Sequence, residues 1–203
     1  MPDPQHSVHI VDDDAAVRAS IKFLVESVNL NALEYLSADE FMANYRDMSP
    51  GCIILDLRMP GVSGLEAVNM MRDQSILEPI VIMTGHGDVP VAVRALKLGV
   101  FDFLEKPCND NLLIETVHRA ISKDVKDRLE RASQTSIQNS LGSLTGRENS
   151  VLGLLVTGQS NKATADTLAV SRKTIERHRS SIMRKLNAKS FAHLVQIVER
   201  NRG

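Results

Sequence analysis

Tryptophan is absent from this chain of 203 residues, and only two cysteines occur, Cys52 in an apolar run and Cys108 after a proline. Two isolated cysteines provide neither the ligand spacing of a zinc site nor a disulfide framework. The chain also lacks an apolar run of about 18 residues and a leader with a charged and then an apolar part, which argues against membrane insertion and export. We therefore expect a cytoplasmic protein without a membrane partner.

The formal net charge of −1 hides two regions of opposite charge. Residues 1–143 contain 13 Lys and Arg against 21 Asp and Glu, whereas residues 144–203 contain 11 against 4. A compact basic region is typical of proteins that bind nucleic acid. The sequence thus indicates two units with different partners, the first acidic and the second basic.

The acidic region alternates short apolar runs with segments of helical apolar spacing, a pattern typical of a parallel sheet with helices on both faces. A fifth helix is expected to begin near Asn109 and to run past the sheet. Asp14 predicts a cap at the first helix, and Ser37 with Glu40 predicts a capping box at the second. The expected strands are residues 8–11, 31–35, 52–56, 80–84 and 101–106, and the first four helices are residues 15–28, 37–46, 63–72 and 89–98.

Residues 133–140 are polar and small, which predicts a linker after the fifth helix. From Leu144 the pattern is purely helical, with helices expected at residues 145–157, 162–168, 172–186 and 190–200. The expected organisation is a first domain over residues 5–125, a helical extension and linker over residues 126–141, and a small all-α domain of four helices over residues 142–203.

Three carboxylates stand where strands are expected to end. Asp12 and Asp13 follow the first strand, and Asp56 follows the apolar run at residues 52–55. Ligands of an open α/β sheet bind outside the carboxyl ends of its strands. Because crowded carboxylates raise one another's pKa unless a positive charge compensates them, we expect a cation at this site.

An ordered set of residues follows the expected strand ends: Asp12, Asp13, Asp56, Met59, Pro60, Gly64, Thr84, Gly85, Lys106 and Pro107. Over roughly residues 5–125, this set resembles the receiver domain of two-component response regulators. The resemblance implies a five-stranded, flavodoxin-like α/β fold in which Asp56 takes a phosphoryl group from a sensor histidine kinase. Taken singly, a strand-end Asp is usually a helix cap and a lone Lys is usually solvated, so only the joint order indicates a site.

The resemblance also implies that three oxygen ligands hold a Mg²⁺ ion beside the acceptor. They are the carboxylates of Asp13 and Asp56 and the backbone carbonyl of Arg58, while Asp12 acts through the water shell of the ion. Mg²⁺ prefers oxygen ligands and often binds together with phosphate.

Lys106 and Thr84 are expected to contact the phosphoryl oxygens, since phosphoryl transfer depends mainly on positioning and charge neutralisation. Thr84 and Phe103 match the switch positions of receivers, although simple strand packing also explains an aromatic at Phe103. The resemblance implies a cis Lys106–Pro107 bond, and X-Pro bonds are where cis peptides occur. Cys108 departs from the aromatic residue often found after this pair.

A second ordered set lies in the basic region: Leu144, Thr145, Gly146, Arg147, Glu148, Val151, Leu152, Gly158, Ser160, Asn161, Lys162, Ala165, Leu168, Val170, Ser171, Thr174, Ile175, His178, Ile182, Lys185 and Leu186. It resembles the LuxR-type helix-turn-helix domain, with Gly146 in place of a usual proline and Thr164 in place of a usual aliphatic residue. The resemblance implies a supporting helix at residues 162–168 and a recognition helix at residues 172–186 in the major groove.

The expected DNA contacts, assigned by family position, are to bases from Glu176, Arg177 and Ser180 and to phosphates from Lys173, Thr174 and His178, with Lys162 and Arg184 completing the set. Glu176 either accepts from a cytosine amino group or pairs with a neighbouring arginine. The last helix is expected to expose apolar surface that resembles the family's dimer contact, from Phe191, Leu194, Val195, Ile197 and Val198.

Together the two regions resemble the NarL/FixJ group of response regulators. The expected protein is phosphorylated on Asp56 by a sensor histidine kinase, dimerises, binds promoter DNA and activates transcription with RNA polymerase. It is not expected to be an enzyme beyond its own phosphoryl transfer and slow dephosphorylation. One alternative is a metal-dependent phosphohydrolase, which Arg58 disfavours because some such enzymes carry a second Asp there. The other is a constitutive DNA-binding protein whose acidic domain only dimerises.

Overall fold

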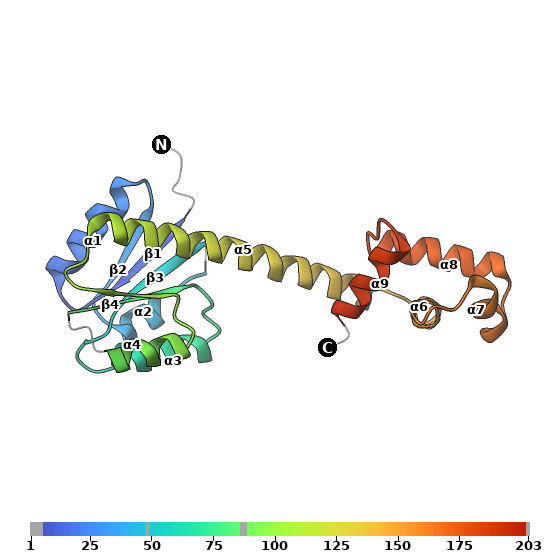
Figure 1. Cartoon of the computed structure of the whole chain (residues 1–203), viewed down its shortest axis with the longest axis horizontal. Helices are drawn as coiled ribbons and strands as arrows, with labels where there is room; N and C mark the ends of the chain where they lie inside the picture. The colour runs from blue at the N-terminus through green and yellow to red at the C-terminus, as the bar shows by residue number, and fades with distance from the viewer. Residues whose placement is uncertain (1–5, 48, 86–88, 202–203) are drawn as a thin grey trace. The chain divides into compact units, whose positions relative to one another are not determined.

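The computed structural model of the chain describes residues 6–47, 49–85 and 89–201. It divides into two compact units, Met1–Leu129 (the first unit) and Glu130–Gly203 (the second unit). The 33-residue helix α5 (Asp110–Gly142) begins in the first unit and ends in the second (Figure 1).

The first unit contains one parallel sheet with the strand order β2-β1-β3-β4-β5. The strands are β1 (Ser7–Val11), β2 (Asn31–Tyr35), β3 (Gly51–Asp56), β4 (Ile80–Thr84) and β5 (Asp102–Glu105). This is the flavodoxin-like order, in which the order of adding strands reverses between β1 and β3, and such folds bind ligands in the crevice at the carboxyl ends of these strands. The structure confirms the expected α/β fold.

Helices cover both faces of this sheet. Figure 1 shows α1 and α5 on one face and α2, α3 and α4 on the other. The bounds of the first four helices are α1 (Ala15–Ser27), α2 (Ala38–Asn44), α3 (Gly64–Asp73) and α4 (Val89–Lys97).

The central strand β3 is buried along its whole length because each face of the sheet has its own core. Alternate residues of a strand point to opposite faces. Ile53 and Leu55 therefore pack in the core under α2, α3 and α4, whereas Cys52 and Ile54 pack in the core under α1 and α5.

Side-chain caps fix the starts of several helices. Asp14 accepts hydrogen bonds from the amides of the first turn of α1, as predicted. Ser37 caps α2, but the predicted capping box there is wrong, because the Glu40 carboxylate accepts from the amide of Leu36 and not from that of Ser37. Complete capping boxes occur instead at Ser63 with Glu66 and at Thr145 with Glu148.

The second unit is purely helical, with α6 (Gly146–Val156), α7 (Asn161–Thr167), α8 (Arg172–Lys185) and α9 (Phe191–Arg200) after the end of α5. The helices α7 and α8 are joined by a tight turn and form the expected helix-turn-helix. The core between the helices is formed by apolar residues that include Val151, Leu155, Ile175, Ile182 and Leu194.

Two expectations for the helical parts differ from the structure. Residues 133–140 are part of α5, and most of their side chains are exposed, so this segment has no apolar periodicity although its backbone is helical. Of the apolar residues expected on an exposed face of α9, Leu194, Ile197 and Val198 are buried in the second unit, whereas Phe191 and Val195 are half-buried. Among the described residues, no helix combines the length and apolar character needed to span a bilayer.

Thr164 in α7 provides a test of packing in the second unit. Its side chain is 0% exposed, and its hydroxyl has no hydrogen-bond partner among the described residues. An unsatisfied buried polar group costs about 1–3 kcal/mol. Thr164→Val keeps the branched shape without the hydroxyl, so we expect the free energy of unfolding of this unit to rise by about 1 kcal/mol.

The measurement is native-state hydrogen exchange of α7 and α8 amides in the full-length protein. Thr167→Val on the exposed side of α7 is the matched control, because the Thr167 hydroxyl donates to the carbonyl of Ala163. Unchanged or reduced protection in Thr164→Val would contradict the prediction.

Candidate functional site

The strand register brings the predicted acidic site together at one edge of the sheet. Residue pairing places Val11 beside Leu55 and Asp56 beside Met83. The ends of β1, β3 and β4 are therefore level, and the residues that follow them lie side by side. Lys106 reaches the same edge just after β5, where its amide donates to the carbonyl of Thr84 at 2.7 Å.

Lys106 joins two of the predicted carboxylates directly. Its Nζ lies 2.5 Å from Asp12 Oδ2 and 2.6 Å from Asp56 Oδ1. Asp12 and Asp56 are only 3% and 6% exposed, so their charges need this compensation. Burial disfavours the charged form of Lys106, but the hydrogen bonds to the two carboxylates outweigh burial and raise the pKa of Lys106 above its ordinary value. The Lys106–Pro107 peptide bond is cis, as the resemblance implied.

Backbone amides hold the other oxygens of the two carboxylates. The amide of Asp14 donates to Asp12 Oδ1 at 2.9 Å, and that of Arg58 donates to Asp56 Oδ2 at 2.8 Å. Gly64 is needed beside this turn, because a Cβ there would lie 2.6 Å from the carbonyl oxygen of Asp56. The residues of this turn thus hold both the carboxylate and the backbone of Asp56 in place.

The two predicted switch residues differ in their surroundings. Thr84 is 1% exposed, and its hydroxyl has no hydrogen-bond partner among the described residues, although it lies at the edge that carries Asp56. Such a hydroxyl is free to bind a further oxygen. Phe103 is half-buried and packs against the core under α2, α3 and α4.

The donor types at this edge suit a hard cation, since carboxylates and carbonyls are the ligands that Mg²⁺ prefers. In the part of the chain that the structure describes, however, no group of three or more Asp, Glu, His or Cys side chains is placed to hold a metal. The Lys106 ammonium lies between Asp12 and Asp56, and Asp13 is exposed. The donor types fit the ion by chemistry, and the Lys106 ammonium carries a positive charge between two of the carboxylates.

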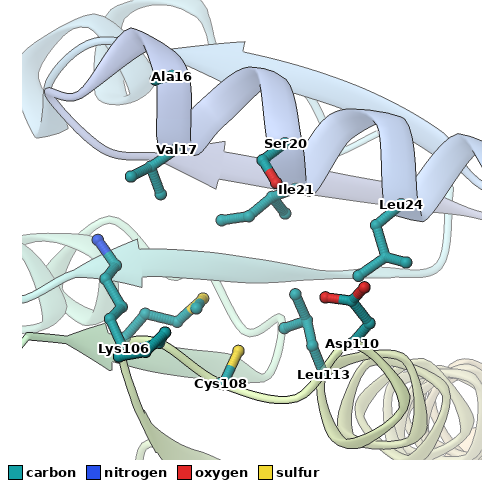
Figure 2. A pocket seen from close by; sticks show the side chains of 11 residues that line it. Ala16, Val17, Ser20, Ile21, Leu24, Lys106, Cys108, Asp110 and Leu113 are labelled. Carbon is teal, nitrogen blue, oxygen red and sulfur yellow. The ribbon is translucent and has the colours of Figure 1, made fainter.

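An apolar groove lies beside this site, between α1 and the start of α5. Figure 2 shows Ile21 and Leu24 of α1 facing Cys108 and Leu113 across it, with Lys106 at one end. The groove has a volume of about 570 Å³. Burial raises the pKa of the Cys108 thiol, so the thiol is protonated at neutral pH and does not have the character of a redox-active thiolate.

A basic surface follows α8 in the second unit. Lys173, Arg177 and Arg184 are exposed on this helix, and Lys162 is exposed on α7. The remaining predicted contacts also lie on α8, where His178 and Thr174 are half-buried and Ser180 and Glu176 are exposed.

The structure shows which of the two alternatives for Glu176 holds in the chain without DNA. Glu176 accepts from Arg172 Nε at 3.1 Å, in an exposed pair one helical turn apart, so it is paired with a neighbouring arginine. The hydroxyl of Ser180 donates to the carbonyl of Glu176 at 3.0 Å, and that of Thr174 lies 2.8 Å from the Ser171 hydroxyl. These exposed pairs are weak enough to exchange for DNA contacts.

A buried carboxylate links α6 to α8 and was not assigned from the sequence. Glu148 is 5% exposed, and it accepts hydrogen bonds from Lys185 at 2.8 Å, from the amide of Thr145 at 2.8 Å and from Ser181 at 2.7 Å. The bond from Lys185 is the main reason that the pKa of Glu148 is lowered to about 2. Its sequence signal is the Thr145-x-x-Glu148 capping box.

A second unassigned network lies at the amino ends of β3 and β4. Arg128 of α5 contacts Asp47 at 2.6 Å, Glu78 at 2.8 Å and the buried Asp124 at 2.7 Å. Asp124 also accepts from the amide of Gly51, the first residue of β3, at 3.0 Å. The only sequence signal for this network is the i, i+4 spacing of Asp124 and Arg128, because the other partners lie far away in the chain.

Family models match both units of the chain. The model of the response regulator receiver domain matches residues 8–118, and the model of bacterial regulatory proteins of the luxR family matches residues 142–198. Receiver domains typically bind Mg²⁺.

Similar proteins cover nearly the whole chain. It is 39% identical to the transcriptional regulatory protein FixJ of Azorhizobium caulinodans, over 94% of this chain and 90% of that protein. It is 35% identical to the response regulator protein TodT of Pseudomonas putida, over 98% and 88%. Among solved structures, it is similar to the response regulator StyR with a TM-score of 0.88 and 37% identity, over 97% of this chain and 99% of that chain.

The Glu148 network makes the second unit sensitive to acid. Glu148 has a pKa of about 2 in the folded chain against about 4.5 without the network. A lowered carboxylate pKa stabilises the fold above about pH 4.5, and this stabilisation is lost as the pH falls through about 2. We expect the protection of α6 and α8 amides against hydrogen exchange, corrected for intrinsic rates, to decrease over this range.

Glu148→Gln is expected to remove this part of the pH dependence, whereas Asp166→Asn, on the exposed side of α7, serves as the control. An equal pH dependence in Glu148→Gln and the unmodified protein would show that the network does not stabilise the fold.

Proposed function

We propose that this chain, which belongs to the two-component response regulators and is a transcription regulator with a receiver and a LuxR-type DNA-binding domain, is switched by phosphorylation of Asp56. The observation that carries this proposal is the contact of Lys106 with both Asp56 and Asp12 at the carboxyl end of the sheet. We assign residues 5–125 to the receiver, residues 126–141 to a helical extension and residues 142–203 to the DNA-binding domain.

The proposed acceptor step transfers a phosphoryl group from a phosphohistidine of a sensor kinase. A carboxylate oxygen of Asp56 attacks phosphorus, a new O–P bond forms as the P–N bond breaks, and the electron pair of the P–N bond stays on the histidine nitrogen. Lys106 stabilises the charge that develops on the phosphoryl oxygens, and the Thr84 hydroxyl donates to one of them.

We assign Mg²⁺ to the carboxylates of Asp13 and Asp56 and to the backbone carbonyl of Arg58, with Asp12 acting through the water shell of the ion. When bound, the ion neutralises the negative charge of the acidic site and of the phosphoryl group. Lys106 Nζ contacts two carboxylates, and an ammonium has three donors, so one donor remains for an oxygen of the phosphoryl group. Phosphorylation of Asp56 would place that oxygen close to the Lys106 ammonium, which already contacts the Asp56 carboxylate.

The signal is proposed to pass through Thr84 and Phe103. A phosphoryl group adds about −1.5 to −2 charges at neutral pH. It thereby gives a partner to the Thr84 hydroxyl, which has none now among the described residues. A move of Thr84 toward the phosphoryl group leaves room for Phe103 to turn inward, and the change favours a conformation that exists already.

The proposed output is a homodimer that binds promoter DNA and activates transcription with RNA polymerase. Its chemical activity is proposed to be limited to its own phosphoryl transfer and slow dephosphorylation, since response regulators with DNA-binding domains are typically not enzymes. A cytoplasmic location follows from these partners. The residues assigned to DNA are Lys162, Lys173, Thr174, Glu176, Arg177, His178, Ser180 and Arg184.

Asp56→Asn tests the acceptor. We expect the full-length protein to incorporate phosphate from radiolabelled acetyl phosphate with Mg²⁺, and Asp56→Asn to incorporate none, because the amide is not a nucleophile of comparable strength. Chelation of Mg²⁺ is expected to suppress labelling as well. Asp73→Asn, an exposed carboxylate on α3, is the control.

Three outcomes would contradict the proposal. Labelling of Asp56→Asn moves the acceptor elsewhere, and turnover of added phosphomonoesters indicates a phosphohydrolase. DNA binding that acetyl phosphate leaves unchanged indicates a constitutive DNA-binding protein.

Arg177→Ala tests the base-reading assignment. An arginine that contacts a base edge contributes about 1–3 kcal/mol of discrimination, so the variant is expected to lose this much binding to a selected duplex and less to a random one. The affinities are measured by fluorescence anisotropy at fixed salt, after selection of the duplex with the phosphorylated protein. Arg200→Ala, exposed in α9, is the control. Equal losses on both duplexes would make Arg177 a phosphate contact.

A further inference from the structure

Arg179 is a basic residue of α8 whose side chain contacts α7 and α9 within the second unit. Its guanidinium carbon lies 5.0 Å from the centre of the Phe191 ring, and its Nη1 lies 3.5 Å from Asn161 Oδ1. The residue is half-buried, whereas Arg177 and Arg184 on the same helix are exposed. Arg179 therefore contacts the first residue of α7 and the first residue of α9 from the recognition helix.

A polar hollow lies at this three-helix contact. It has a volume of about 460 Å³, and its lining includes Lys162, Arg172, Arg179, Gln159 and Phe191. Three of these side chains are cationic, which makes the hollow attractive to an anion.

Glu176, the carboxylate of α8 nearest to these cations in the sequence, already has an ion-pair partner. Glu176 pairs with Arg172 through Nε only, in an exposed contact of 3.1 Å. Lys162 is exposed on α7, and no ion pair of Lys162 or Arg179 occurs among the described residues. The hollow thus keeps an excess of positive charge.

We propose that Arg179 is a positioning residue for DNA binding: by stacking on Phe191 and contacting Asn161, it holds the hollow with Lys162 and Arg172 so that one phosphate of the DNA backbone binds there. The inference rests on the proposed function, since it assumes that α8 lies in the major groove. It adds a residue that does not itself read bases but fixes the distance between the phosphate contact on α7 and the base contacts on α8.

The geometry requires an arginine and not only a positive charge. A guanidinium is planar, so it stacks on an aromatic face and donates sideways from its edge at the same time. An ammonium on a flexible stem has no such face. Arg179→Lys therefore keeps the charge of the domain and removes the contact geometry, which separates positioning from simple electrostatics.

Salt dependence measures phosphate contacts directly. Each neutralised phosphate contributes about −0.9 to the slope of log affinity against log salt concentration. Lys162→Ala is expected to reduce the magnitude of this slope by about one unit. Arg179→Lys is expected to do the same, and to weaken binding by about tenfold near 0.1 M salt, although the net charge is unchanged.

The experiment uses full-length protein treated with acetyl phosphate, one selected duplex and one random duplex, over a series of salt concentrations. The variants are Lys162→Ala, Arg179→Lys, the double variant and Phe191→Leu, which keeps apolar packing but removes the ring. We expect the double variant to lose little more than either single variant, because both substitutions remove the same phosphate contact. Hydrogen exchange of α7, α8 and α9 shows that each variant is folded.

The inference is overturned if the salt-dependence slope is unchanged in both Arg179→Lys and Phe191→Leu. It is also overturned if the loss of binding free energy in the double variant equals the sum of the two single losses. If Arg179→Lys loses protection in these helices, the slope of Phe191→Leu decides. Should the unmodified protein bind neither duplex with a salt-dependent affinity, the proposed DNA-binding mode fails as a whole. If the unmodified protein shows the expected slope and Lys162→Ala a reduced one, the proposed DNA-binding mode is supported. The Arg179 variants then test only the role of Arg179.

Discussion

The contact of one ammonium with two buried carboxylates is the constraint on which the first unit depends. Asp12 and Asp56 end neighbouring strands, so the parallel sheet forces two negative charges together, and burial removes the water that would otherwise screen them. Lys106, directly after β5, provides the positive charge that compensates both carboxylates. The positive charge of Lys106 therefore balances the two carboxylates, and the same three side chains are the ones that the proposed phosphoryl transfer would use.

The second unit also contains a buried carboxylate that is compensated by a lysine. Glu148 is held by Lys185, Ser181 and its capping partner, so α6 and α8 are joined by a carboxylate whose hydrogen bonds are satisfied. Arg179 joins α8 to the starts of α7 and α9 on another side. The recognition helix is thus fixed by charged side chains that point inward, while its exposed charges remain available to a partner.

The sequence was sufficient to predict the strands and the place of the acidic site, because apolar runs fix the strand ends and parallel strands bring those ends to one edge. It did not show that Lys106 contacts both carboxylates, since distances between residues of different strands are not encoded in spacing along the chain. It also missed the partners of Arg128 for the same reason. The helical state of residues 133–140 was missed because a helix exposed on most sides carries no apolar period.

The Arg128 network ties helix α5 to the amino-end side of the sheet in the first unit. Through Asp124 and Gly51 it fastens α5 to the amino end of β3, and through Glu78 it fastens α5 next to the amino end of β4. The carboxyl ends of these strands, where the acidic site lies, are the opposite ends. Phosphorylation of Asp56, as proposed, therefore acts on strands whose amino ends are tied to the same helix that continues into the second unit.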